Sequence, residues 1–376
     1  MKNQILNSLL VISVISGSQA WGYLDENAER GLQHFELLSP SGYSERCIIP
    51  KGILKDYREK DFKDLQNLCQ ISFYDFSETS ETAICPKLYS TSPALEIDKI
   101  KLKKFNSRTE YEKNYCSTPD RPGKKIAKFK QGITCSYTPS LLAYYQVSTY
   151  LGRILHIPEV VLRTMDINEQ RKQVKRAIPF AQDLYTKQDA IRWGWESGWP
   201  AALNNPGGSA KGYNGSWLFT KDFKGIYGAL IENPRGEEKY TEVYGKGSYD
   251  TRYERLKRQI PYQRVASSKS IQELAPQNFE EGAQILIQMK DVSDMVIIDT
   301  LLSQQDRVGN IAYRNYAYYM VGKEVRSEKI DFEDDGSIEA KIIEKIQAEG
   351  PTSQIVTVKE MLLKDNDCGV AKSNMA

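Results

Sequence analysis

The side chains best suited to chemistry lie together in the C-terminal part of the chain. Asp306 and Arg307 are adjacent, Asn310 follows four residues after the aspartate, and Asp331 opens a later acidic run. A positioned carboxylate can orient a hydroxyl group and take its proton. A second carboxylate and an amide oxygen can hold Mg²⁺ or Mn²⁺ against phosphate groups, because hard cations prefer oxygen ligands. The set predicts phosphoryl transfer.

Residues 299–310, and then the triplet 330–332, resemble the catalytic and metal-binding loops of atypical kinases. The families are the secretory-pathway (Golgi casein kinase) kinases, the HipA-like kinases and the phosphatidylinositol 3/4-kinases. The resemblance implies a two-lobed kinase-like fold and ATP as the phosphoryl donor. It also implies that Asp306 and Arg307 are the catalytic pair, and that Asn310 and Asp331 bind Mg²⁺ or Mn²⁺.

Residues 127–130 (Ala-Lys-Phe-Lys) resemble the strand that carries the nucleotide-binding lysine of these kinases. Lys130 is the first candidate for that role. Lys128 is the second, because alternate residues of a strand share a face. Residues 141–163 resemble the regulatory helix and the strand after it. Residues 89–93 (Tyr-Ser-Thr-Ser-Pro) are a candidate phosphate-covering loop.

The chain departs from these families at three places. Leu141 stands where they have the Glu that pairs with the nucleotide-binding lysine, so Lys130 needs another acid, for which Glu159 is a candidate. The Asp306-to-Asn310 spacing is one residue shorter than usual, and Val308 replaces a histidine. These departures leave a pseudokinase open as an alternative.

Apolar periodicity supplies the elements that would position these residues. Because strands come first and helices follow, the fold class is α+β, with a strand-rich N-lobe and a helical C-lobe. We expect an N-terminal cap over 21–80, an N-lobe with a helical insertion over 81–232 and a C-lobe over 233–376. The predicted strands are 83–89, 95–102, 125–130, 160–162, 216–219 and 225–232; the predicted helices are 138–155, 279–290, 293–303 and 338–348; and residues 316–321 and 325–330 are predicted to form a hairpin.

The first twenty residues indicate export. Lys2 precedes an apolar run over 5–15, and Ser18-Gln19-Ala20 provides small residues for cleavage, so residues 1–20 are predicted to be a signal peptide. No later run is long and apolar enough to predict a membrane span. The six cysteines predict disulfides of open pairing in a secreted, periplasmic or secretory-pathway compartment, with Cys368 a candidate to staple the C-terminus.

The composition excludes several functions. The net charge is only +2, which argues against a nucleic-acid binder, and only two histidines are present, which argues against His-based catalysis and zinc sites. We therefore expect an exported kinase-like phosphotransferase acting on a hydroxyl of a protein or glycan, with oligomeric state open. The alternatives are a secreted pseudokinase that binds a nucleotide or partner, and an exported structural or adhesive domain.

Overall fold

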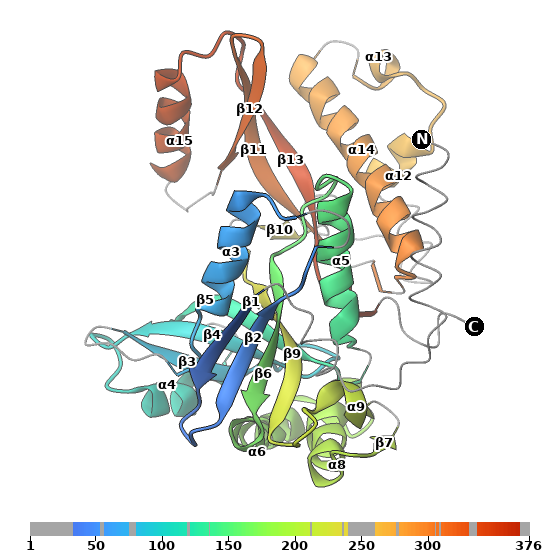
Figure 1. The fold of residues 1–376 in the computed structure, drawn as a ribbon. Helices are drawn as coiled ribbons and strands as arrows, with labels where there is room; N and C mark the ends of the chain where they lie inside the picture. Colours follow the sequence, from blue (N-terminus) through green and yellow to red (C-terminus); the bar gives the residue numbers. More distant parts are fainter. Residues whose placement is uncertain are drawn as a thin grey trace.

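The computed structural model describes residues 33–52, 56–74, 80–118, 121–134, 136–210, 213–234, 237–239, 260–275, 278–304, 306–307, 310–330 and 337–368. The described chain is α+β, as predicted, and contains two separate main sheets (Figure 1). The larger sheet lies in the lower part of Figure 1 and the smaller one in the upper part.

The larger sheet has seven strands, and every neighbouring pair is antiparallel. Its two outermost strands on one side come from the segment that we expected to be a separate cap, so that expectation was wrong: residues 33–49 belong to the sheet. The polar residues of these two strands interrupt the apolar pattern by which a strand is recognised in a sequence. In spatial order the strands are β1 (Gln33–Leu38), β2 (Ser44–Ile49), β6 (Val160–Asp166), β9 (Gly225–Glu232), β5 (Lys124–Gln131), β4 (Ala94–Lys101) and β3 (Ser80–Pro86).

Helices cover the centre of this sheet on both faces, since all seven residues of β6 are buried. α3 (Glu59–Cys69) and α5 (Thr138–Tyr150) both pack against β6 and β9, and α6 (Ile167–Leu184) packs against β3, β6 and β9. The predicted helix at 138 is confirmed, with Pro139 in its first turn. Shorter elements complete this part: α4 (Arg108–Tyr115), α7 (Ala190–Trp193), η1 (Gly194–Gly198), α8 (Trp199–Asn204), β7 (Ser209–Ala210), β8 (Tyr213–Asn214) and α9 (Gly215–Leu218). The strand predicted at 216–219 is therefore wrong, because α9 occupies most of it.

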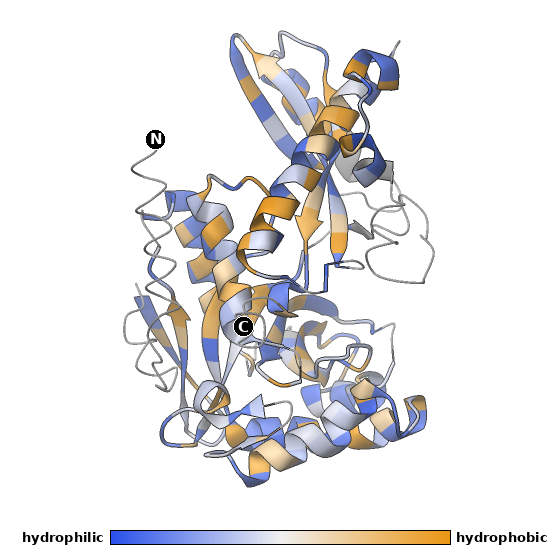
Figure 2. Cartoon of the chain, turned by 90° about the vertical axis from the view of Figure 1, so that its right-hand side faces the viewer, coloured by the Kyte–Doolittle hydropathy of each residue, from blue (hydrophilic) through white to orange (hydrophobic). Residues whose placement is uncertain are grey.

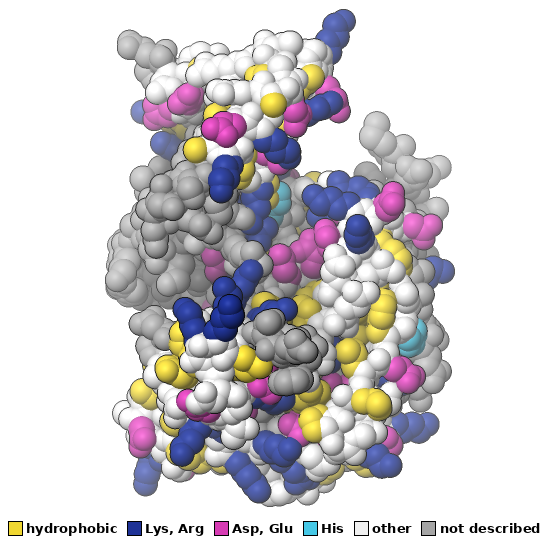
Figure 3. Space-filling model, turned by 90° about the vertical axis from the view of Figure 1, so that its left-hand side faces the viewer, with side chains coloured by type: hydrophobic (Ala, Val, Ile, Leu, Met, Phe, Trp, Pro, Cys, Tyr) yellow, Lys and Arg dark blue, Asp and Glu magenta, His cyan; other side chains and the backbone are white. Residues whose placement is uncertain are grey.

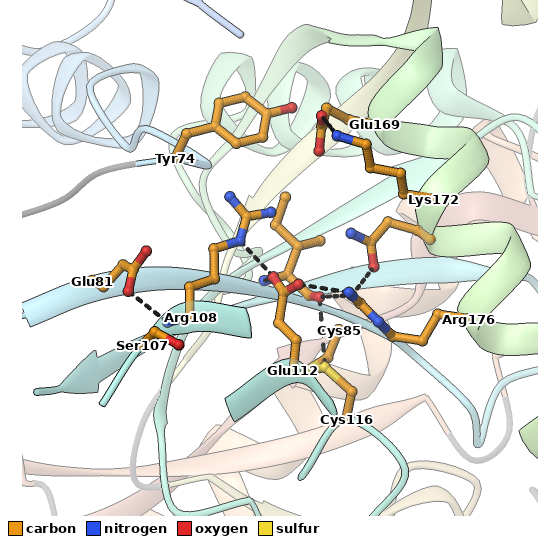
Figure 4. A network of polar contacts seen from close by, with 12 residues as sticks. Tyr74, Glu81, Cys85, Ser107, Arg108, Glu112, Cys116, Glu169, Lys172 and Arg176 are labelled. Atoms are coloured by element: carbon orange, nitrogen blue, oxygen red, sulfur yellow. Dashed lines mark hydrogen bonds and ion pairs between the residues drawn. A yellow bond between two sulfur atoms is a disulfide. The ribbon is translucent and has the colours of Figure 1, made fainter. Parts of the chain in front are cut away.

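Side chains of α4 and α6 form hydrogen bonds with the backbone amide and carbonyl of Ile84 in the edge strand β3 (Figure 4). The Ile84 amide donates to Glu112 at 2.9 Å, and Arg176 donates to the Ile84 carbonyl at 3.2 Å. Arg108 and Arg176 also both contact the Glu112 carboxylate, at 2.6 and 2.7 Å. An edge strand with satisfied backbone groups is a poor template for pairing with another chain.

The smaller sheet is built around β11 (Ile311–Val321), with β10 (Glu238–Lys239) and β12 (Glu324–Ile330) along one edge and β13 (Val356–Leu363) along the other. The predicted hairpin is confirmed as β11–β12. The segment predicted as a helical C-lobe thus contains a sheet. Its strand β13, which follows the last predicted helix and pairs with β11, was not predicted. The helices of this part are α12 (Ile260–Val265), α13 (Ile271–Leu274), α14 (Phe279–Leu301) and α15 (Ser337–Ala348), with the short helix η2 (Asn366–Cys368) after β13.

α14 replaces the two helices predicted at 279–290 and 293–303. It packs along β13 and its C-terminal end meets α5, so it connects the two parts (Figure 1). Figure 2 shows apolar stretches along this helix. Ile297 and Leu301 are among its exposed apolar side chains. Within the described residues, the structure has no helix with the length and hydropathy needed to cross a bilayer.

Two disulfides, Cys47–Cys69 and Cys85–Cys116, confirm that cysteines pair in this chain. The first joins β2 to α3, and the second joins β3 to the end of α4. Cys368 ends η2, whereas Cys135 lies outside the described residues, so a staple from Cys368 stays a prediction.

Candidate functional site

Lys130 lies where the two parts meet. Its side chain is almost completely buried, and its ammonium contacts Asp365 Oδ1 at 2.7 Å and Asp367 Oδ2 at 3.0 Å. Burial alone would lower the pKa of Lys130, but the two carboxylates raise it above its ordinary value. Burial would raise the pKa of Asp365, and the cations of Lys130, Lys87 and Lys128 instead bring it well below its ordinary value. The Lys130 ammonium and the Asp365 carboxylate therefore stabilise each other's charged forms.

The segment 364–367 that brings these carboxylates is fixed at several points. The Tyr137 amide donates to the Asp367 carbonyl at 2.9 Å, and the Ser140 hydroxyl donates to the Asn366 carbonyl at 2.7 Å. Both donors belong to the start of α5. The Lys364 amide donates to the Asn310 carbonyl at 2.9 Å. The segment thus touches β5, α5 and the 306–310 region at once.

Arg307 anchors the same segment from the other side. Its guanidinium makes a two-point contact with Asp299 at 2.8 and 2.9 Å, and it donates to Asn366 Oδ1 at 2.7 Å and to the Lys364 carbonyl at 3.0 Å. Asp299 also accepts from the Tyr144 hydroxyl at 3.0 Å, which ties α14 to α5. Arg307 is buried, so its contacts are those of a loop support rather than of a phosphate ligand.

The structure brings together some of the predicted residues. Lys130 and the 306–310 region both contact segment 364–367. Asn310 Nδ2 donates to the Asp306 carbonyl at 2.6 Å. Asp331 lies outside the described residues, and its role stays a prediction.

The acid partner of Lys130 was wrongly predicted. Glu159 does not contact Lys130; its carboxyl group is paired with that of Glu232, and burial followed by this hydrogen bond raises the pKa of Glu159 to about 7. Asp365 and Asp367 were missed because we took them for part of a polar tail. The available signal was an apolar strand, 356–363, that leads directly into Asp-Asn-Asp.

Two further lysines share the face of the sheet that carries Lys130. Lys128 precedes it by two residues on β5, and Lys87 follows β3, with its amide bonded to the Ala94 carbonyl at 2.8 Å. Ala94 is in turn the register partner of Lys130. Among the described residues, neither the Lys87 nor the Lys128 ammonium forms a hydrogen bond or ion pair.

The environment disfavours the charged form of both amines. Burial, followed by the nearby cations Lys364 and Lys87, lowers the pKa of Lys128 to about 7. Burial likewise lowers the pKa of Lys87, despite the proximity of Asp365. An anion placed between the two amines would remove this penalty.

The loop after Lys87 joins β3 to β4 and includes the predicted phosphate-covering segment 89–93. It rests on the chain after β5, where the Thr134 hydroxyl donates to the Thr91 carbonyl at 3.3 Å, and an added Cβ at Gly194 would lie 2.5 Å from Pro93. The loop is therefore held against Thr134, after β5, and against the start of η1.

The carboxylates fit a divalent cation that is shared with a ligand. Asp365 and Asp367 each contact Lys130 through one carboxylate oxygen, and carboxylate oxygens are the preferred ligands of Mg²⁺. The described residues contain no group of three or more His, Cys, Asp or Glu side chains that could hold a metal ion. A cation here would need phosphate oxygens and water to complete its shell, which is the usual arrangement for Mg²⁺ with a phosphorylated substrate.

The space beside Lys128 is small. A cavity of about 30 Å³ is lined by Lys128, Leu141 and Ile231 from the first part, together with Asp365 and Asn366. A much larger cleft of about 800 Å³ opens between the two parts, next to α3, β11 and β12, and Figure 3 shows the waist of the molecule on this side. The cavity and the cleft share two lining residues, Ile157 and Glu232, so they adjoin.

Neither family models, nor the sequences of curated proteins, nor solved structures give a match to this chain. Its function must therefore be argued from its own residues.

Proposed function

We propose that this protein is an exported kinase-like phosphotransferase that transfers the γ-phosphoryl group of ATP to a hydroxyl group of a protein or glycan. The observation that carries the proposal is the buried ion cluster of Lys130 with Asp365 and Asp367, next to the Asp306–Asn310 loop. Kinases need this combination: a lysine for the phosphates, an acid for the metal and a loop aspartate for the acceptor.

The proposal gives each group a task. Lys130 would hold the phosphates, and Asp365 or Asp367 would hold Mg²⁺ or Mn²⁺, together with Asn310 or Asp331. A metal held there would supply positive charge against the phosphates. Asp306 would orient the acceptor hydroxyl and take its proton, while Arg307 keeps the loop against segment 364–367.

The ion cluster also explains how Lys130 is retained without the usual acid. α5 contains no Asp or Glu over its full length, and Leu141 is buried where the pairing Glu was expected. The carboxylates of segment 364–367 take over the electrostatic role, since a buried ammonium without a partner would lose its proton.

The two disulfides support export, because such bonds persist mainly in oxidising compartments. The acceptor is a separate matter: the large mixed-charge cleft next to the candidate site is wide enough for a protein loop or a sugar chain.

A secreted pseudokinase is the second candidate. Two features favour it. α5 offers no acid to Lys130, and the volume of the cavity beside Lys128, about 30 Å³, is far below the roughly 300 Å³ of a small-molecule site. In this case the cleft would bind a nucleotide or partner without transfer.

The test combines binding with turnover on the full chain. Thermal shift with ATP and Mn²⁺ should raise the melting temperature, and phosphate release or self-phosphorylation should be measurable. Asp306→Asn should abolish turnover and keep the thermal shift. The control is Lys125→Met, which should keep both turnover and the thermal shift. Lys125 lies on the same strand as Lys130 but is paired with Glu96 at 2.6 Å.

Each outcome selects one reading. A shift with turnover supports the phosphotransferase, and a shift without turnover supports the pseudokinase. No shift with either metal would leave the third reading, an exported structural domain.

A further inference from the structure

We propose that the Lys130 site recognises the phosphate chain of its ligand and not the nucleobase, so that inorganic tripolyphosphate binds about as well as ATP. This inference rests on the proposed function and specifies which part of the donor the protein holds. Its basis is the pair of amines, Lys87 and Lys128, that accompany Lys130 on one face of the sheet.

The geometry supplies three lysine amines in a short span of sheet. Lys128 and Lys130 alternate along β5, and Lys87 follows the β3 residue Pro86, whose register partner Leu95 adjoins Ala94, the partner of Lys130. A condensed phosphate can contact several such amines at once, since it carries negative charge along its whole length. A nucleobase has no charge to offer them.

Charge balance favours an added anion. The two carboxylates of Asp365 and Asp367 are already committed to Lys130, and Lys364 is paired with Glu237. Lys125 and Arg121 are paired with Glu96. Lys87 and Lys128 are the cations of this face that have no such carboxylate among the described residues.

The shape of the site disfavours a base. The apolar residues that could form a slot for a flat ring, Leu141, Ile157, Val160 and Ile231, line the same 30 Å³ cavity as Lys128. At about 30 Å³, this cavity is too small for a base. A base entering there would also bury the amine further, without providing a counter-charge.

Titration calorimetry of the full chain tests the inference with tripolyphosphate, ATP and adenosine, each with Mg²⁺ at neutral pH. We expect dissociation constants for tripolyphosphate and ATP within about threefold of each other and no binding of adenosine, because the base adds less than about 1 kcal/mol. Binding of ATP more than about tenfold tighter than tripolyphosphate would overturn the inference and leave the phosphotransferase standing. Binding of neither polyanion would overturn both.

Two variants locate the effect. Lys87→Met should weaken both polyanions by about tenfold, as for the loss of one charged contact. Lys128→Ala should also weaken tripolyphosphate, but it frees the cavity and should shift the ATP-to-tripolyphosphate preference toward ATP. Lys125→Met, which removes a lysine already paired with Glu96, should change neither. An unchanged preference in Lys128→Ala, with folding intact, contradicts the assignment of Lys128.

Discussion

At the scale of single residues, the candidate site is a balance of buried charges. Lys130 and Asp365 stabilise each other's charged forms, whereas the half-buried amine of Lys128 forms no ion pair among the described residues. Both situations change with pH, in opposite directions, and each can be measured independently of any activity.

Lys128→Met should stabilise the protein at neutral pH. The pKa of Lys128 is lowered to about 7 in the folded chain, so between pH 7 and about 10.4 the unfolded chain binds more protons, and the wild type gains stability as the pH rises. The variant lacks this gain. We expect its advantage to be about 1–3 kcal/mol at pH 7 and to shrink toward pH 10. Chemical denaturation at both pH values measures it, and a less stable variant at pH 7 would contradict the assigned burial.

Asp365→Asn should instead destabilise the protein at neutral pH. The pKa of Asp365 is depressed, so the ion pair contributes stability above about pH 4 that is lost as the pH falls through the lower folded value. We expect a loss of about 2–4 kcal/mol at pH 7 and a much smaller difference at pH 2, since Lys130 is left with Asp367 alone. Urea titrations at the two pH values give both numbers. The exposed Asp183, changed to Asn, is the control and should cost nothing measurable.

At the scale of elements, the junction depends on segment 364–367, which joins β13 to α5, β5 and the end of α14 through Arg307. Most of the predicted strands and the hairpin were found because their apolar periodicity is local, whereas the strand predicted at 216–219 is mostly the short helix α9. The carboxylates of segment 364–367 were not predicted as partners of Lys130, because 235 positions of the chain separate Asp365 from that lysine. No spacing rule along the chain reports such a contact.

Arg307→Lys should therefore loosen the junction although it keeps the charge. A lysine cannot reproduce the two-point contact with Asp299 together with the bonds to Asn366 and the Lys364 carbonyl. We expect a loss of about 2–4 kcal/mol and faster amide hydrogen exchange in residues 364–367 and at the start of α5. Arg326→Lys, at an exposed pair with Glu349, should leave both unchanged. Unchanged exchange in the Arg307 variant would mean that β13 alone holds the segment.

At the scale of the whole molecule, the sequence predicted the α+β class and the export-type cysteines. It did not predict the seven-stranded extent of the larger sheet or the second sheet. β1 alternates half-buried and exposed residues but carries Gln33, His34 and Glu36, and β2 opens with Ser44, Glu45 and Arg46, so neither shows the apolar periodicity that marks a strand in the sequence. The unions of distant segments, as in β2–β6 and β11–β13, come from tertiary packing that local periodicity does not encode.

The disulfides should make stability depend on redox conditions. Cys85–Cys116 closes a loop of 31 residues around the Glu112 network, which corresponds to about 3–4 kcal/mol in the chain-entropy model. We expect the double substitution Cys85→Ala and Cys116→Ala to lower the free energy of unfolding by about that amount, measured by denaturant titration. The variant should also become insensitive to reductant at that site. Equal stability of variant and wild type would show that the Arg108–Glu112–Arg176 contacts alone hold α4 on β3.

The bond between Lys130 and Asp365 spans 235 positions of the chain. During vectorial synthesis or secretion, the amine emerges long before its carboxylates, so the half-made protein must keep that amine in water. The junction can exclude water only after residues 365–367 have followed β13, so a chain halted before Asp365 would leave Lys130 without the two carboxylates that it contacts.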